Sequence, residues 1–135
     1  MTALAEIRAQ VAAAFQGGGG LTAYDDPPEE PTPPCAVVEP EEVDFRPARA
    51  GGFRRGGEQW TLSVFVLISP ADAANAARKT DEFFDRSAND LKDAIEGAFD
   101  GRPSIEVAGG DRWGEYPFPS GLRLAGFRLV CEVLT

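Results

Sequence analysis

The chain contains 135 residues, of which 43% are hydrophobic and 26% are charged, and this composition suits one globular domain with its own core. Histidine is absent and only two cysteines occur, which excludes histidine-dependent nucleophiles, HExxH and cysteine-rich zinc sites, and a disulfide framework. With 22 acidic and 13 basic residues, the formal net charge of −9 argues against a protein that grips DNA, RNA or anionic lipid with its whole surface.

The first segment has an amphipathic pattern that predicts a helix over residues 2–16. Its apolar stripe consists of Leu4, Ile7, Val11 and Phe15. The run Gly17–Gly20 lacks the Lys-Ser or Lys-Thr of a Walker loop and follows a helix where a dinucleotide motif follows a strand, so we interpret it as a flexible link. Neither a signal peptide nor a spanning apolar stretch is present, and a soluble cytoplasmic protein with two free thiols is expected.

Residues 21–24 predict a short strand, after which the composition changes. The segment 25–34 contains five prolines, which forbid a helix and favour an extended loop. Its acidic residues are Asp25, Asp26, Glu29 and Glu30. Calcium loops place acids at alternating positions around a glycine turn, and the prolines interrupt that pattern, so a solvated acidic loop is the better interpretation. The apolar residues 35–38 then predict a strand.

Between residues 46 and 57 the sign of the charge reverses, which predicts a basic arm or hairpin tip. Its basic residues are Arg46, Arg49, Arg54 and Arg55. They occur among glycines with one aromatic residue, Phe53, which is weak as a nucleic-acid signature. Two interpretations stay open: a solvated tip, and an arm that pairs with acidic residues on a neighbouring copy of the chain. We prefer the second.

Residues 58–69 alternate in a way that predicts a central strand covered on both faces. A helical pattern is predicted from Pro70 to Asp100, and Ser87 with Asp90 forms a capping pattern that allows a kink or break there. Residues 104–108 predict a short strand and Gly109–Asp111 a turn.

The final strand is predicted over residues 122–134. Its apolar residues change parity near Gly126, which suggests a bulge at that glycine. Cys131 is interpreted as a small buried hydrophobic residue. Trp113 and Tyr116 lie before this strand, in a segment interrupted by prolines, and they are candidate interface residues.

These elements predict an α/β (α+β) fold with one domain over residues 1–135. We expect a mixed, mostly antiparallel sheet packed by the N-terminal helix and one long central helix, with long charged loops. No general base, activated nucleophile, metal or cofactor motif occurs, so the chain is expected not to be an enzyme. Its two loops of opposite charge are instead typical of a protein that works against partners.

The order of these elements resembles the tail terminator proteins of long-tailed (siphophage-type) bacteriophages. The resemblance covers nearly the whole chain and rests on YDDPP (24–28), PCAVVEP (34–40), WTLSVFVLI (60–68) and DEFFD (81–85). It implies a virion protein, assembled in the host cytoplasm, that forms a ring, expected to be a hexamer, at the head-proximal end of the tail. Such a ring caps the tube, stops its polymerisation and joins the head connector.

The implied partners are other copies of the chain, the tail tube protein and the head-completion or connector protein, with DNA passing through the ring without specific binding and no membrane involved. Two other interpretations remain: another neck protein (a head-closure or head–tail adaptor subunit), and a monomeric cytoplasmic binding module. The candidate interface residues are Arg46, Arg49, Phe53, Arg54, Arg55, Asp25, Asp26, Glu29, Glu30, Trp113 and Tyr116.

Overall fold

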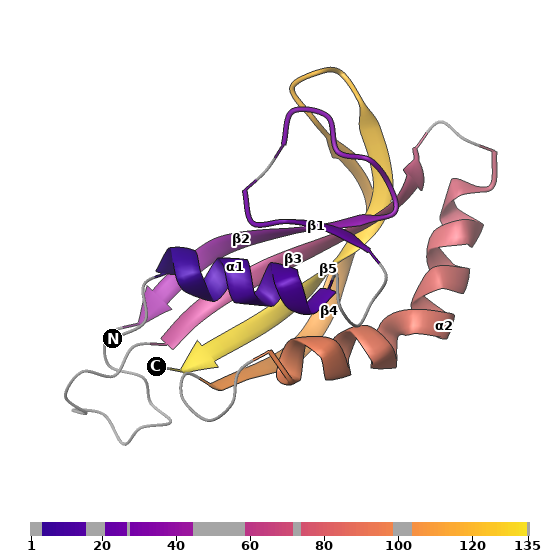
Figure 1. The fold of residues 1–135 in the computed structure, drawn as a ribbon. Coiled ribbons are helices and arrows are strands. Elements are labelled where there is room, and N and C mark those ends of the chain that lie inside the picture. The colour runs from indigo at the N-terminus through magenta and orange to yellow at the C-terminus, as the bar shows by residue number, and fades with distance from the viewer. Residues whose placement is uncertain are drawn as a thin grey trace.

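The computed structural model describes residues 4–15, 21–26, 28–44, 59–71, 74–98 and 104–134. In chain order the elements are α1 (Leu4–Ala14), β1 (Thr22–Tyr24), β2 (Cys35–Asp44), β3 (Gln59–Pro70), α2 (Ala76–Glu96), β4 (Ser104–Pro117) and β5 (Arg123–Leu134). Within these residues the strands form one sheet in the order β1-β2-β3-β5-β4 (Figure 1). The predicted α+β fold with a mixed sheet is confirmed, because β1 runs parallel to β2 and the other neighbouring strands are antiparallel.

Both helices pack on the same face of the sheet and form the main core with it (Figure 1). The stripe predicted for the first helix is confirmed: Ile7, Val11 and Phe15 are fully buried and Leu4 packs at their edge. From α2, Leu91 and Ile95 enter the same core. The Gly17–Gly20 run lies outside the described residues.

Strand β3 has the two covered faces that its sequence predicted. Leu62, Val64 and Val66 belong to the core beneath the helices. Phe65 and Leu67 belong to a second, smaller cluster on the opposite face. This central position follows from the alternation of β-branched and aromatic residues, which pack well on both faces of a pleated sheet.

The predicted start of the long helix at Pro70 is wrong. Pro70 is the last residue of β3 and pairs with Leu124, and the backbone N–H of Ala71 donates to the carbonyl oxygen of Arg123 at 2.8 Å. The helix begins at Ala76, after Asn75 in a left-handed conformation with φ of 67°. A proline can end a strand as readily as it can start a helix, so its presence alone did not distinguish the two. From Ala76 to Glu96 the helix is continuous, and Figure 1 shows it bending part-way along.

The predicted turn at Gly109–Asp111 is also wrong, because β4 continues through it to Pro117. The pairing of β4 with β5 is irregular here: its register shifts once between Val107 and Gly109 and again between Asp111 and Gly114. Arg112 and Gly114 take positive φ values of 56° and 153° within the second shift. A bulge and a turn draw on the same residue types, which explains the error.

The bulge predicted at Gly126 belongs instead to the neighbouring strands. β5 pairs residue by residue, while the shifts fall between Leu67 and Ser69 of β3 and within β4. The change of parity reflects two covered faces of one strand: Leu122 and Leu124 join the second cluster, whereas Phe127 and the odd-numbered residues after it join the main core.

Candidate functional site

The predicted interface residues fall into three groups. Arg46, Arg49, Phe53, Arg54 and Arg55 lie outside the described residues. The four acidic residues lie in the segment between β1 and β2, and the two aromatic residues lie on β4. The structure therefore brings the acidic residues together, but it does not place them with Trp113 and Tyr116 in one site.

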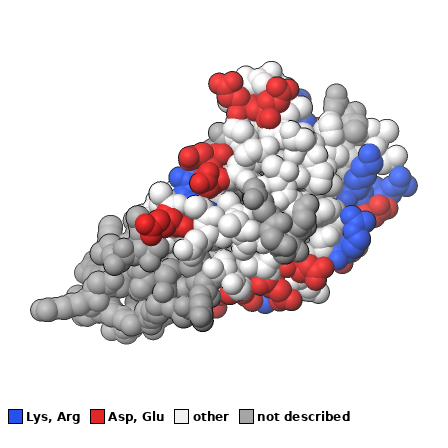
Figure 2. All heavy atoms as spheres, viewed as in Figure 1, with Lys and Arg blue, Asp and Glu red and all other residues white. Residues whose placement is uncertain are grey.

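The acidic segment is an exposed surface at the end of the sheet where β2 begins. Asp25, Asp26, Glu29 and Glu30 are all exposed, and acidic atoms gather over this segment in Figure 2. Asp26 accepts a hydrogen bond from Arg8 of α1 at 2.8 Å, which ties the segment to the first helix. The Tyr24 hydroxyl accepts a bond from the Thr32 N–H at 3.3 Å and ties its other end. The segment is a loop tied to α1 and joined between Tyr24 and Thr32, and its carboxylates are exposed.

Trp113 and Tyr116 lie on opposite faces of β4. Trp113 is on the helix side, where it stacks on Phe127 with ring centroids 5.4 Å apart and meets the edge of Phe84 at 5.2 Å. Tyr116 packs edge-on against Phe65 at 5.3 Å, on the other face. Burial raises the pKa of the Tyr116 hydroxyl, whose proton is donated to the Arg112 carbonyl.

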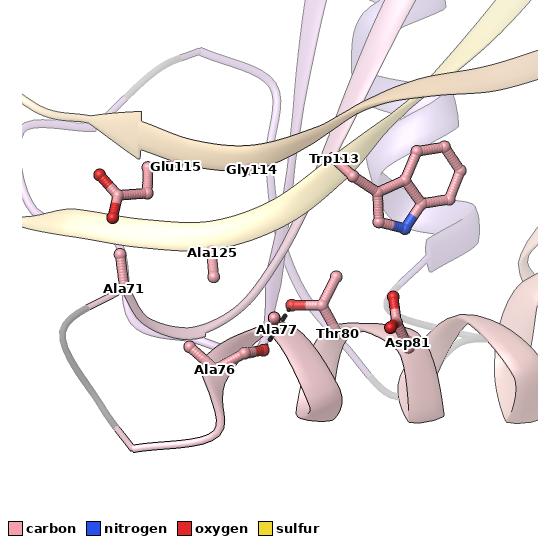
Figure 3. Close-up of a pocket in the computed structure, with 9 residues that line it drawn as sticks. All are labelled: Ala71, Ala76, Ala77, Thr80, Asp81, Trp113, Gly114, Glu115 and Ala125. Carbon is pink, nitrogen blue, oxygen red and sulfur yellow. Dashed lines mark hydrogen bonds between the residues drawn. The ribbon is translucent and has the colours of Figure 1, made fainter.

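A groove of about 270 Å³ lies between the beginning of α2 and β4 (Figure 3). We call it the Trp113 groove, and it is lined by Ala71, Ala76, Ala77, Thr80, Asp81, Trp113, Gly114, Glu115 and Ala125. Its small residues leave room beneath Trp113, which is 44% exposed and is the exposed large hydrophobic residue among those that the structure describes. The sequence carried a signal for this groove in the alanine-rich beginning of the helix, but not for the strand that faces it.

The polar groups of the groove differ in their availability. Thr80 donates its hydroxyl to the Ala76 carbonyl at 2.9 Å and so is satisfied within the helix. Glu115 is paired with Arg123. Asp81 makes no ion pair with any residue that the structure describes, and in Figure 3 its carboxylate points from α2 toward Trp113. The groove therefore offers an aromatic ring and one carboxylate that is free to bind a cation.

The opposite face of the sheet carries a polar cluster beside its apolar half. Arg128 donates to both carboxylate oxygens of Asp111, at 2.7 and 2.6 Å, and to the Ser63 hydroxyl at 3.3 Å. These bonds to Arg128 hold the pKa of the Asp111 carboxyl below its ordinary value. This arrangement joins three neighbouring strands, so we assign it a structural role.

Neither thiol is suited to nucleophilic chemistry. Cys35 and Cys131 are buried and not joined in a disulfide. Burial raises the pKa of Cys35 to about 11 and that of Cys131 to about 12, so both stay protonated at neutral pH. Among the described residues no cluster of acidic and cysteine side chains could hold a metal ion. In the same part of the chain, no helix is long and apolar enough to span a membrane.

The sequence was also compared with known proteins. No protein-family model matches the chain, and no curated protein matches it significantly.

Proposed function

We propose that this chain is a structural subunit of a phage tail, a tail terminator that assembles as a ring, expected to be a hexamer, on the head-proximal end of the tail tube. Bound there it stops the tube protein from polymerising further and presents the surface to which the head connector attaches. The supports for this proposal are the resemblance in element order and an unequal distribution of charge along the sheet.

The charge distribution is the observation that carries the proposal. Beside the first half of β2, from Cys35 to Val38, lies the exposed acidic segment. At the other end of β2, where Asp44 pairs with Gln59, the chain enters and leaves the arginine-rich segment 45–58. Figure 1 shows the end of β2 and the start of β3 together, far from the beginning of α2.

The acidic segment begins beside Val37 and Val38 of β2, because Tyr24 pairs with Val37 and Arg8 binds both Asp26 and the Val38 carbonyl oxygen, whereas the basic segment follows Asp44. Strand β2 is 10 residues long, which at about 3.3 Å per residue separates its ends by about 30 Å. Each of the four arginines lies within five residues of Asp44 or Gln59, which confines its backbone to about 18 Å from that end. We infer that attraction between the two segments acts between different copies of the chain.

A contact between unlike ends of two copies is heterologous, and it leaves one free end on each copy. Such contacts either close into a ring or continue as a filament. The net charge of −9 suits a ring whose opening DNA crosses, because a negative surface does not retain the phosphate backbone.

The first test is the native mass of the purified protein over a wide concentration range, with negative-stain images of the heaviest species. We expect a closed ring of about six copies. A chain with Arg54→Glu and Arg55→Glu should assemble more weakly, because each substitution replaces attraction to acidic residues of the neighbouring copy by repulsion. A control with Arg78→Glu on α2 should assemble as the parent does. Assembly of the double variant at the parent concentration would contradict the pairing.

The second test concerns the position in the virion. Loss of a terminator should give tails of abnormal and mostly excessive length. Tails of normal length beside unattached full heads would instead identify another neck protein, a head-closure or adaptor subunit. A protein that remains monomeric both alone and with tail tubes would contradict both assignments and favour a binding module.

A further inference from the structure

We propose that the Trp113 groove is the docking site for the sequence Phe53-Arg54-Arg55 of a second copy of this chain. The proposal rests on the ring-forming role above and specifies the contact by which neighbours recognise each other. In this contact Arg54 and Arg55 bind at the Trp113 groove, and Arg46 and Arg49 remain to pair with the acidic segment of the neighbour.

The groove combines the two features that bind an aromatic residue followed by arginine. Ala71, Ala76, Ala77 and Ala125 line it with methyl groups only, so a ring can enter beneath Trp113 without displacing a polar group. The exposed face of Trp113 and the carboxylate of Asp81 lie at the same opening (Figure 3). An arginine placed there would stack on the indole ring and bind the carboxylate at once.

The electrostatic surroundings of Asp81 permit a cation. Asp81 is the sixth residue of α2 and so lies beyond the first turn. The positive end of the helix dipole acts mainly within the first turn, so it does little to neutralise the Asp81 carboxylate. Glu115 adds a second carboxylate to the rim, already paired with Arg123. On the outer side of α2, the guanidinium group of Arg78 lies 3.8 Å from the Glu82 carboxylate, which partly neutralises its positive charge.

The segment 51–57 has the complementary composition. Phe53, Arg54 and Arg55 are preceded by Gly51-Gly52 and followed by Gly56-Gly57. Glycine on both sides lets the backbone approach a surface closely and adopt whichever conformation the contact requires. Aromatic residues and arginine are also the residue types that dominate the energetics of protein interfaces.

The length of the chain favours a contact between different molecules, because the alanine end of the groove lies beyond the reach of Phe53 in the same molecule. Phe53 is six residues from Gln59, so its backbone lies within about 21 Å of the start of β3. The groove begins at Ala71, past the far end of a strand of 12 residues, which is about 36 Å long. A copy that inserts its own segment into a neighbour therefore keeps its own groove free for the next copy.

This arrangement can be tested with two variants that each disable one half of the contact. The groove variant carries Asp81→Lys, and the segment variant carries Phe53→Ser, Arg54→Ser and Arg55→Ser. Each alone should be monomeric at concentrations where the parent assembles. Mixed in equal amounts they should form a heterodimer and stop there, because only one intact groove meets one intact segment. The control Asp90→Lys, on an exposed part of the same helix, should assemble like the parent.

A peptide of residues 48–58 provides a test that does not depend on ring formation. Added to the segment variant, it should change the fluorescence of Trp113 saturably, and Asp81→Asn should weaken that binding at least about tenfold. Subtracting the signal of a Trp113→Phe version removes the contribution of Trp60.

The outcomes separate this inference from the proposed function. Rings that persist in the groove variant, with no peptide binding, would overturn the inference and leave the ring standing. Peptide binding that Asp81→Asn weakens, in a parent chain that never forms rings, would support the docking site and remove the proposed function. Peptide binding that Asp81→Asn leaves unchanged would overturn the docking site.

Discussion

Gly126 of β5 lies directly against the carbonyl group of Val66 on β3: a Cβ atom added to the glycine would stand 2.0 Å from the Val66 oxygen and 2.9 Å from its carbonyl carbon. Both partners are backbone atoms in the middle of a sheet, so they cannot turn aside as a flexible side chain would. The glycine is therefore required by close approach of two strands, and φ is not the reason.

Gly126→Ala should destabilise the folded protein by about 3 kcal/mol or more, because the strands must separate locally to admit the methyl group. The matched control is Gly109→Ala on β4, where nothing lies within 4 Å of the added atom. We expect the control to change the free energy of unfolding by less than about 1 kcal/mol. Urea denaturation of the three proteins measures both values, and equal stability of the two variants would refute the close approach.

Removal of the charge on Asp111 should weaken the hydrogen-bonded cluster of Arg128, Asp111 and Ser63 on the sheet face opposite the helices. Asp111 is about half exposed, so Asp111→Asn should lower stability by only about 1 kcal/mol at neutral pH. The folded pKa of Asp111 lies below its ordinary value of 3.8, so this contribution is present above that pH and is lost as the pH falls further.

Unfolding of the parent and of Asp111→Asn should therefore converge in acid. Denaturation curves at pH 7 and at about pH 3 provide the measurement, with Asp90→Asn as an exposed control. A difference between parent and variant that does not shrink in acid would show that Asp111 acts through something other than its charge.

The two buried thiols predict a loss of stability at alkaline pH. The unfolded chain releases their protons near pH 9, whereas the folded protein keeps them until about pH 11 for Cys35 and about pH 12 for Cys131. In that interval the unfolded state binds fewer protons, so stability falls by about 1 kcal/mol per pH unit for each thiol. Cys35→Ala should show a shallower decline, and an unchanged slope would contradict this origin.

Phe84 connects the long helix to the sheet through two aromatic contacts, and its loss should be costly. Its ring meets Trp113 and Phe127 edge-on, each at 5.2 Å. Phe84→Ala should destabilise the fold by about 3 kcal/mol, at the lower end of the range for a phenylalanine because the ring is only partly buried. Asp85→Ala, next to it and exposed, should stay within about 0.5 kcal/mol of the parent. Thermal unfolding of both variants measures these changes in stability. A Phe84→Ala protein as stable as the Asp85→Ala protein would show that the phenyl ring is dispensable.

The sequence predicted those elements whose identity depends on periodicity. The stripe Ile7, Val11 and Phe15 and the two faces of β3 could be read directly, because each pattern has one period over its whole length. Errors arose at glycine and proline. Pro70 ends a strand, and residues 109–111 lie within one. Gly126 is needed because the Val66 carbonyl group of the neighbouring strand lies against it. Each of these features depends on residues that are distant in sequence.

The candidate site was predicted only in part, for a similar reason. The acidic segment could be recognised because its acidic residues are close in sequence and its prolines exclude a helix, although the segment bends where an extended loop was predicted. The Trp113 groove joins Ala71, just after β3, with residues on α2, β4 and β5, and it exists only when these elements are packed. Trp113 was predicted as an aromatic interface residue, but Asp81, which gives the groove its charge, could not be distinguished from the other acidic residues of the helix.

The strand order has a consequence for how the chain folds during synthesis. β5 follows β4 along the chain but lies between β3 and β4, so β4 has no partner in the sheet until β5 has been made. A ribosome that has translated residue 117 has therefore produced a strand with an apolar face and nothing to pair with. The sheet can be completed only after its last strand has been made. Folding of the whole domain therefore follows the translation of Leu134.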